Sequence, residues 1–401
     1  MQLATPSTHN HPFNPRVLEW ARIYAGYSLD IAAQELKISK KQLSEWENVN
    51  SNSLPSMTKA EKMATLYGRP VLEFYFKKVP DLKPCSLVPD FRCVQGMAVE
   101  KERPFLLKLQ RWGEEQRLNL LDLAEMLEVD IPDLPSEIFT EDLDDVECVA
   151  GRAREILGPN IDKQIGLKSS EKSQFPAMLR EHLSHRGVLV LYRSELIKAK
   201  IRGMCLFSSR LPTIIFTKEA PNAQAFTIAH ELGHVVSKQR AISGTFSVSQ
   251  PNTWKHKEVE QWCDRFAAAF LVPAAAIYEI KSSPVHPGDR ISDNELNSLA
   301  RRFAVSEHAM LIRLIELGYV HRNFYWLQKR KELIEREFEH KSSRGRSRFY
   351  ASRVQNRVGN FYTGLVLEAW DSGEITADNA AEFLGIKRLQ HLDEIHRNFS
   401  V

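Results

Sequence analysis

One stretch of this chain, residues 226–236, reads Phe-Thr-Ile-Ala-His-Glu-Leu-Gly-His-Val-Val. It places His230 and His234 four residues apart in an apolar segment whose spacing predicts an α-helix. Such positions share one helix face, about 6 Å apart along the axis, so two imidazoles can bind one zinc ion. Glu231 lies about 100° around the helix, where it can reach a water on the metal and accept its proton. The stretch therefore predicts a zinc-dependent hydrolase, most often a peptidase.

The residues around this motif favour a helix that is anchored in a core. Pro221 and Asn222 suit a helix start, and Phe226 and Val235 are among the apolar residues that would anchor it. Gly233 lets the second turn pack closely against another element. The alternative interpretation is an ordinary amphipathic helix with two surface histidines.

A catalytic zinc needs a third protein ligand and an open fourth position. The next predicted helix begins near Lys257 and carries several carboxylates. Glu260 is the first choice for the third ligand and Glu258 is the alternative. Glu260 and Asp264 lie on one face at i, i+4. Spacing alone equally allows these carboxylates to form a solvated acidic face.

The motif continues into a wider resemblance, which covers roughly residues 170 to 320. Phe-Thr-x-Ala-His-Glu-Leu-Gly-His, followed about two dozen residues later by Glu-x-Trp-Cys-Asp-Arg-Phe-Ala-Ala, resembles the ImmA/IrrE family of zinc metallopeptidases. Ile201-Arg202-Gly203 is similar to that family's Arg-Gly turn. The resemblance implies zinc ligands His230, His234 and Glu260, with Glu231 as the catalytic base. It also implies a protein substrate, because family members typically cut a partner repressor, whereas some act as antitoxins or regulators.

Two functions from different classes follow from these residues. The first is a zinc metalloendopeptidase that cleaves a repressor or regulatory protein in a stress, mobile-element or toxin-antitoxin circuit. The second is a DNA-binding regulator or antitoxin without peptidase activity, in which the metal site is structural or sensory. The retained glutamate of the motif favours the enzyme, since a structural zinc site does not need it. Candidates for a further oxyanion donor are Tyr278, His256 and His286.

Bulk composition is that of an ordinary soluble globular protein of two to four domains: 401 residues, 43% hydrophobic and 26% charged. No charged-then-apolar leader is visible and no apolar run is long enough to span a bilayer, so we expect a cytoplasmic protein without membrane contact. The five cysteines are scattered, which indicates reduced thiols. The net charge of +3 does not decide whether nucleic acid is bound.

Residues 14–76 predict a helical bundle containing a helix-turn-helix. Ser28 and Ser39 are expected to cap its two central helices, which are joined by a tight turn. The segment resembles the Cro/repressor-type (XRE) DNA-binding domain, and this implies double-stranded DNA as a partner through residues 28–48. The exposed early positions of the second helix would contact DNA: Lys40, Lys41, Gln42 and Ser44. Lys37 departs from the pattern, because the turn position it occupies is often glycine. A helical protein-interaction domain is the alternative.

The remaining segments complete a multidomain prediction. Residues 77–165 are a linker and a leucine-rich helical region that could pack on the peptidase or form a homodimer. Residues 166–325 are the α+β, zincin-like metallopeptidase domain, whose small sheet would contain strands near residues 187–192, 205–207 and 213–216. Residues 326–401 are a basic loop and an α-helical region with the outline of a second helix-turn-helix. Solvated surface is the default interpretation of the basic loop, and contact with nucleic acid or an acidic partner is the alternative.

Overall fold

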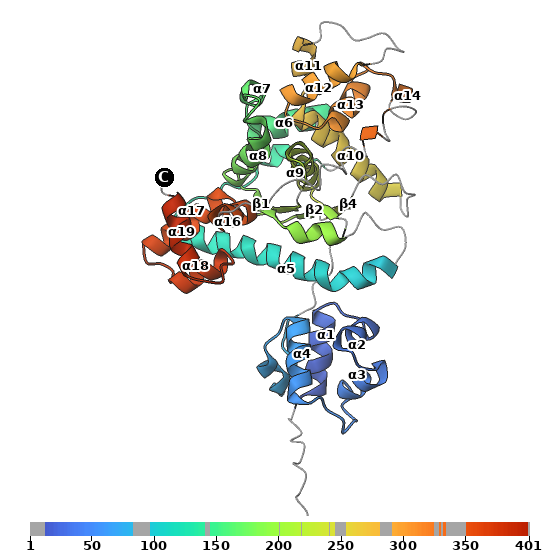
Figure 1. Cartoon of the computed structure of the whole chain (residues 1–401), viewed down its shortest axis with the longest axis vertical. Coiled ribbons are helices and arrows are strands. Elements are labelled where there is room, and N and C mark those ends of the chain that lie inside the picture. Colours follow the sequence, from blue (N-terminus) through green and yellow to red (C-terminus); the bar gives the residue numbers. More distant parts are fainter. Residues whose placement is uncertain are drawn as a thin grey trace, which may run out of the picture. The chain divides into compact units, whose positions relative to one another are not determined.

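The fold is taken from a computed structural model, which describes residues 13–82, 97–140, 145–199, 201–217, 219–239, 241–244, 254–280, 291–324, 329, 332–333 and 350–399. The described residues up to 112 form one compact unit, and those from 113 onward form a second. Most elements are helices, and a small mixed sheet lies in the second unit (Figure 1). None of the described helices has the length and apolar character needed to cross a membrane.

The first unit is built around a bundle of short helices. They are α1 (Pro15–Tyr24), α2 (Leu29–Leu36), α3 (Lys40–Trp46), α4 (Met57–Tyr67) and the 3-10 helix η1 (Val71–Tyr75). Ser28 and Ser39 cap α2 and α3 as predicted, since their side chains accept hydrogen bonds from Ile31 N and Gln42 N. The apolar faces close on one core that includes Leu18, Leu43 and Phe74.

Lys37 ends α2 in the left-handed region, with φ 53° and ψ 54°. This conformation disfavours a residue with a Cβ, so the predicted strain at the turn is present. The amide of Lys37 donates to Gln34 O, and Ile38 N donates to Ala33 O, which closes the turn into α3.

The second unit contains the sheet, whose strand order is β1-β3-β2-β4. Its strands are β1 (Leu189–Tyr192), β2 (Ile201–Leu206), β3 (Thr213–Phe216) and β4 (Ala241–Gly244). β1 runs parallel to β3, and β2 runs antiparallel to both β3 and β4. The small sheet was predicted with three strands, so β4 is an addition. The expectation that Arg202-Gly203 forms a turn is wrong, because both residues lie within β2.

Helices cover both faces of this sheet, with the part of α5 (Met97–Met126) from Gly113 onward on one side and α9 on the other (Figure 1). Gly113 of α5 permits this packing, since a Cβ there would lie 2.7 Å from the Ile215 and Leu206 side chains. From Gly113 onward the leucine-rich helix thus packs on the sheet of the peptidase, one of its two predicted roles. The other helices of this unit are α6 (Val146–Leu157), α7 (Ile161–Gly166), α8 (Phe175–Ser184), α9 (Pro221–Val236), α10 (Trp254–Leu271), α11 (Ala274–Ile280), α12 (Asp293–Arg302), α13 (Glu307–Glu316), α14 (Arg322–Phe324), α16 (Tyr350–Val358), α17 (Asn360–Asp371), α18 (Ala377–Phe383) and α19 (Gln390–Phe399).

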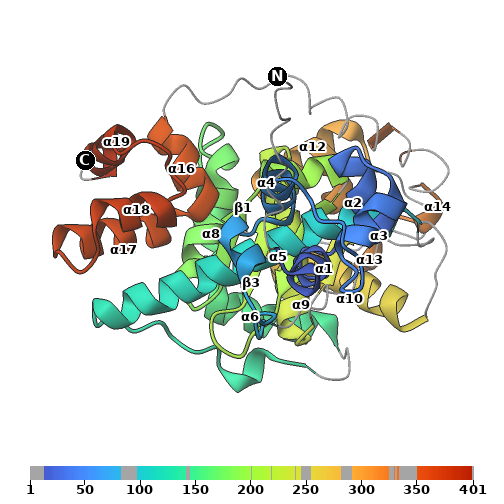
Figure 2. The ribbon, with the colours of Figure 1, turned by 90° about the horizontal axis from the view of Figure 1, so that it is seen from below.

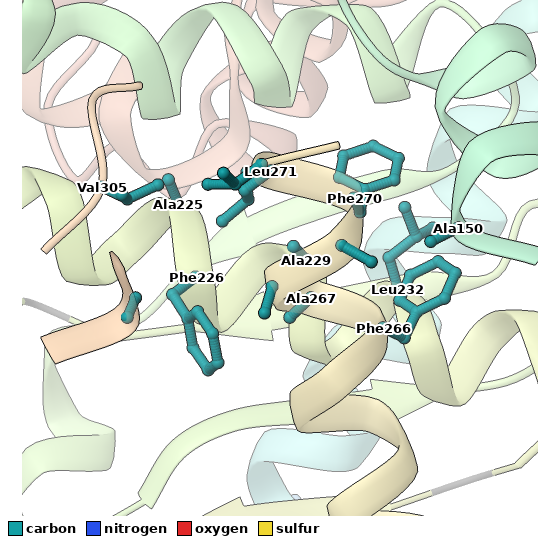
Figure 3. Close-up of a cluster of buried hydrophobic side chains, with 14 of the residues drawn as sticks. Ala150, Ala225, Phe226, Ala229, Leu232, Phe266, Ala267, Phe270, Leu271 and Val305 are labelled. Atoms are coloured by element: carbon teal, nitrogen blue, oxygen red, sulfur yellow. The ribbon is translucent and has the colours of Figure 1, made fainter. Parts of the chain in front are cut away.

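The main core lies between α6, α9 and α10, where Phe266 and Phe270 of α10 pack with Ala229 and Leu232 of α9 (Figure 3). The C-terminal helices α16 to α19 gather at one side of this unit (Figure 2). Buried Arg180 of α8 holds them there, because its guanidinium donates to Asn356 O and Arg357 O at the end of α16. The core of the predicted basic loop, residues 342–348, lies outside the described residues.

Candidate metal centre

The helix α9 carries both histidines of the motif into the core. Pro221 occupies its first turn, where a missing amide hydrogen is tolerated, and every residue from 225 to 236 is buried. The rings of His230 and His234 face the same side, with centroids 5.1 Å apart. The expected i, i+4 geometry is therefore present.

The neighbouring helix α10 brings Glu260 to the two imidazoles. Its Oε2 lies 3.5 Å from His230 Nε2, and its Oε1 lies 3.1 Å from His234 Nε2. One potential ligand atom from each residue falls within 4.8 Å of the others, which forms a metal-binding group. Glu258, the alternative ligand, is exposed and outside this group.

Gly233 allows α9 and α10 to approach closely enough for this geometry. A Cβ at position 233 would lie 3.2 Å from Cys263 Sγ and 3.3 Å from its Cα. Backbone atoms at that distance cannot move aside cheaply, so a side chain here would push the helices apart. The glycine that lowers helix propensity thus serves the contact between the ligand-bearing helices.

A second layer of side chains orients the two histidines. Asp264 Oδ1 lies 2.9 Å from His230 Nδ1, and Cys263 Sγ lies 3.5 Å from His234 Nδ1. A carboxylate on Nδ1 fixes the tautomer of an imidazole and leaves Nε2 available to a metal. The sequence placed Asp264 only on an acidic face with Glu260. Its i, i+4 spacing from the ligand was the signal that could have identified this role.

The donor set fits a divalent metal ion. Among the described residues, His230 Nε2 and Glu260 Oε1 are buried without a hydrogen bond of normal geometry. Burial opposes charge on both groups. Even so, Asp264 and Glu260 raise the pKa of His230 well above its ordinary value. In turn, His230 and His234 outweigh the effect of burial on Glu260 and hold the pKa of its carboxyl well below the usual range. Two imidazole nitrogens and a carboxylate are zinc ligands.

The side chain of Glu231 extends from α9 to strand β2, where it lies against Gly203. It is fully buried. A Cβ at Gly203 would overlap its Oε1 and lie 2.7 Å from its Cγ. Only glycine leaves room for this carboxylate against the strand, which gives a physical reason for the Arg-Gly pair that sequence comparison alone could not supply.

The end of α10 is anchored by side chains that the sequence did not single out. Buried Arg154 donates to Phe270 O, Gln164 donates to Leu271 O, and Arg313 donates to Val272 O. Cationic donors at a helix C-terminus satisfy its free carbonyls and oppose its dipole. These contacts fix the helix that presents Glu260.

The remaining predicted site residues lie elsewhere. The four candidate DNA-contacting residues are exposed on α3, in the first unit: Lys40, Lys41, Gln42 and Ser44. Tyr278 is exposed on α11, and the centroid of its ring lies 6.1 Å from that of Tyr319. His286 and the side chain of His256 lie outside the described residues, so the oxyanion donor stays a prediction.

Comparison with known protein families finds one that matches the part of the chain with this metal-binding group. Residues 185–314 match the model of the Peptidase_M78 family, described as the IrrE N-terminal-like domain. No curated protein and no solved structure matches the chain. The matched segment contains β1 to β4, both ligand-bearing helices and Glu231. Residues 185–314 are therefore a metallopeptidase domain of the IrrE N-terminal-like type, with His230, His234 and Glu260 as its metal-binding group.

Proposed function

We propose that this chain is a zinc-dependent endopeptidase that cleaves a partner repressor or regulatory protein. One observation carries the proposal: ligand atoms of His230, His234 and Glu260 lie within 4.8 Å of one another, and Glu231 lies on the helix that carries both histidines. Two histidines and one carboxylate leave a fourth position open, as in catalytic zinc sites. Most structural zinc sites use four protein ligands instead.

The chemistry divides between the metal and the chain. A zinc ion in this group would act as a Lewis acid and lower the pKa of a water molecule. Glu231 accepts a proton at its carboxylate and returns it to the leaving amine, which is general base and then general acid catalysis. Asp264 holds His230 in the tautomer that binds metal through Nε2. Glu231 needs a fixed position for this role, and the backbone of Gly203 borders it.

The peptidase is tested by cleavage of proteins that the chain meets in its host. Zinc-loaded wild-type chain and Glu231→Gln would be incubated with the product of the neighbouring gene and, separately, with host extract. New N-termini are then identified by mass spectrometry. We expect discrete new termini with the wild type only, since removal of a general base slows the reaction about 10²- to 10⁴-fold. Equal cleavage by both proteins would contradict the role of Glu231.

We also propose that residues 14–76 are a DNA-binding domain. Support comes from α2 and α3, which are short, capped and joined by a tight turn, and from the exposed polar residues of α3. Lys40 Nζ lies 2.8 Å from Asp30 Oδ2, so part of its charge is locally balanced. Lys41 is the more exposed cation of the two.

The DNA-binding proposal is tested by gel shifts with the DNA upstream of the chain's own gene. Lys41→Ala is expected to weaken binding uniformly and reduce the salt slope by about one. Gln42→Ala should instead relax sequence preference. Asp30→Asn, which frees Lys40, should tighten binding severalfold. No shift with wild type at low salt would leave the helical unit as a protein-interaction domain.

The alternative function is a regulator whose metal site is structural or sensory. It shares the ligand set and differs in what Glu231 does. Under this alternative, Glu231→Gln would regulate its target as well as the wild type does, and zinc would still be bound. A reporter assay in the host with both proteins separates the two functions.

A further inference from the structure

A buried chain of polar contacts joins strand β2 to helix α9 beside the catalytic candidates. Arg202 Nε lies 3.1 Å from Glu219 Oε1. The other oxygen of Glu219, Oε2, accepts a 2.6 Å hydrogen bond from Thr227 Oγ1. We name these three residues, Arg202, Glu219 and Thr227, the β2–α9 clamp.

The clamp is shielded from solvent. The Arg202 and Glu219 side chains are 15% and 4% exposed, and Thr227 is buried. Low local dielectric strengthens both the ion pair and the hydrogen bond to the charged carboxylate. The backbone carbonyls of two clamp residues are also held, since Thr217 N donates to Arg202 O and the Gln224 side chain donates through Nε2 to Glu219 O. The carboxylate of Glu219 therefore has a defined position between strand and helix.

Each end of the clamp is next to Glu231. Arg202 precedes Gly203, whose backbone borders the Glu231 carboxylate. Thr227 lies one turn before Glu231, and residues four apart share a helix face. The pairing of β2 with β4 is irregular between Ile201 and Gly203, whereas on its other side Gly203 pairs in register with Phe216 of β3, so this backbone is held by regular strand pairing on one side only.

We propose that the β2–α9 clamp is a positioning device that sets the distance between the Gly203 backbone and Glu231 and so orients the Glu231 carboxylate. This inference rests on the proposed peptidase function, because it assigns a role relative to its general base. A clamp that served only stability could be replaced by apolar packing of similar volume. The two roles therefore predict different results for variants that fold.

The test uses Thr227→Val, which keeps the shape of the side chain and removes the donor to Glu219. Thr227→Ser keeps the donor and is the rescue variant. Thr213→Val is the matched control, because Thr213 is also buried, lies on β3 and donates its hydroxyl to Leu211 O, two residues away. Glu219→Gln provides a second way to weaken the clamp if Thr227→Val fails to fold.

The first readout is independent of peptide cleavage. Acetohydroxamate chelates zinc, and its hydroxyl hydrogen bonds to a carboxylate beside the metal, so its affinity reports the position of Glu231. By calorimetry on zinc-loaded protein, Thr227→Val should bind it roughly tenfold more weakly, the scale of one hydrogen bond to a charged group. Thr227→Ser and Thr213→Val should match the wild type. Zinc affinity, measured by competition with a chelator, should stay unchanged in all of them.

Cleavage kinetics supply the second readout. On a fluorogenic peptide carrying the cleavage site found with host protein, Thr227→Val should lower kcat about tenfold with little change in KM, since a misplaced base affects chemistry more than binding. Unchanged acetohydroxamate affinity in a folded Thr227→Val protein would overturn the clamp as a positioning device. Absence of any cleavage by the wild type would overturn the proposed function instead, and a wild type that binds no zinc would overturn both.

Discussion

A glutamate meets different partners in each of the two units of this chain. In the first unit, both oxygens of Glu47 accept hydrogen bonds from the guanidinium of Arg22, at 2.8–3.0 Å. In the second, both oxygens of Glu260 face imidazole nitrogens, those of His230 and His234. An arginine keeps its proton at any ordinary pH, so the Arg22–Glu47 ion pair offers no ligand nitrogen to a metal. A histidine can lose its proton to solvent and bind a metal ion through the freed nitrogen, so the second group can take part in chemistry.

The comparison extends to the surroundings. The Arg22–Glu47 pair joins α1 to the end of α3 and leaves the polar residues of α3 exposed in solvent. The metal group is carried by α9 and α10, whose apolar side chains pack with those of α6 in one core (Figure 3). Convergent buried groups support a proposal of catalysis from geometry alone. Exposed residues on one helix require a binding measurement, because geometry does not distinguish a contact surface from ordinary solvated surface.

The largest stability effect should come from removing the charge of Glu47 from its ion pair with Arg22. Glu47→Gln leaves the Arg22 guanidinium buried without a counter-charge, so we expect a loss of about 3 kcal/mol in the free energy of unfolding. Glu45→Gln is the control, because Glu45 is 4.0 Å from Lys41 on the surface and its pair should contribute under about 0.5 kcal/mol. Urea unfolding followed at the tryptophans measures both. A similar loss of unfolding free energy in the two variants would contradict the claim that the buried ion pair contributes more than the surface pair.

A second prediction concerns Glu316 in the second unit, whose negative charge is only partly neutralised by the neighbouring Arg313. Burial raises the pKa of Glu316 to about 7, against the opposing effect of Arg313, whose Nη1 lies 3.7 Å away. An acid with a raised folded pKa binds more protons folded than unfolded between pH 4.5 and 7, so stability is lost as pH rises through that window. Glu316→Gln should therefore stabilise by about 2 kcal/mol at pH 8 and hardly at pH 5. An equal effect at both pH values would contradict it.

The smallest effect should come from the strained turn of the first unit. Lys37 has φ 53°, a conformation that glycine adopts without penalty. Lys37→Gly should stabilise by up to about 1 kcal/mol, less the entropy that glycine adds to the unfolded chain. Lys37→Ala is the control, since it removes the charge and keeps the Cβ, and it should not stabilise. Thermal unfolding of the two variants under one buffer condition decides between strain and charge.

Local patterns account for what the sequence predicted. The His-Glu-x-x-His spacing identified α9, and the caps Ser28 and Ser39 located α2 and α3, because such signals lie within a few residues of one another. Glu260 was the first choice over Glu258 from the predicted helix, and the family resemblance implied the same ligand. The structure places Glu260 in the metal-binding group.

What the sequence could not predict depends on distant contacts. Gly203 and Glu231 are brought together by the packing of a strand on a helix, and nothing in the spacing of either motif indicates that contact. The anchors of α10 come from residues more than 40 positions away, such as Arg154 and Arg313. The strand β4 is short and contains serine and glycine, so its composition carries little strand signal.

The most direct test of the central claim is the zinc content of three purified proteins, measured by mass spectrometry of the metal after dialysis. The metal centre described above predicts about one zinc ion per chain for the wild type and for Glu258→Ala, and a loss of zinc from Glu260→Ala. Retention of zinc by Glu260→Ala with loss from Glu258→Ala, or a wild type without zinc, would contradict it.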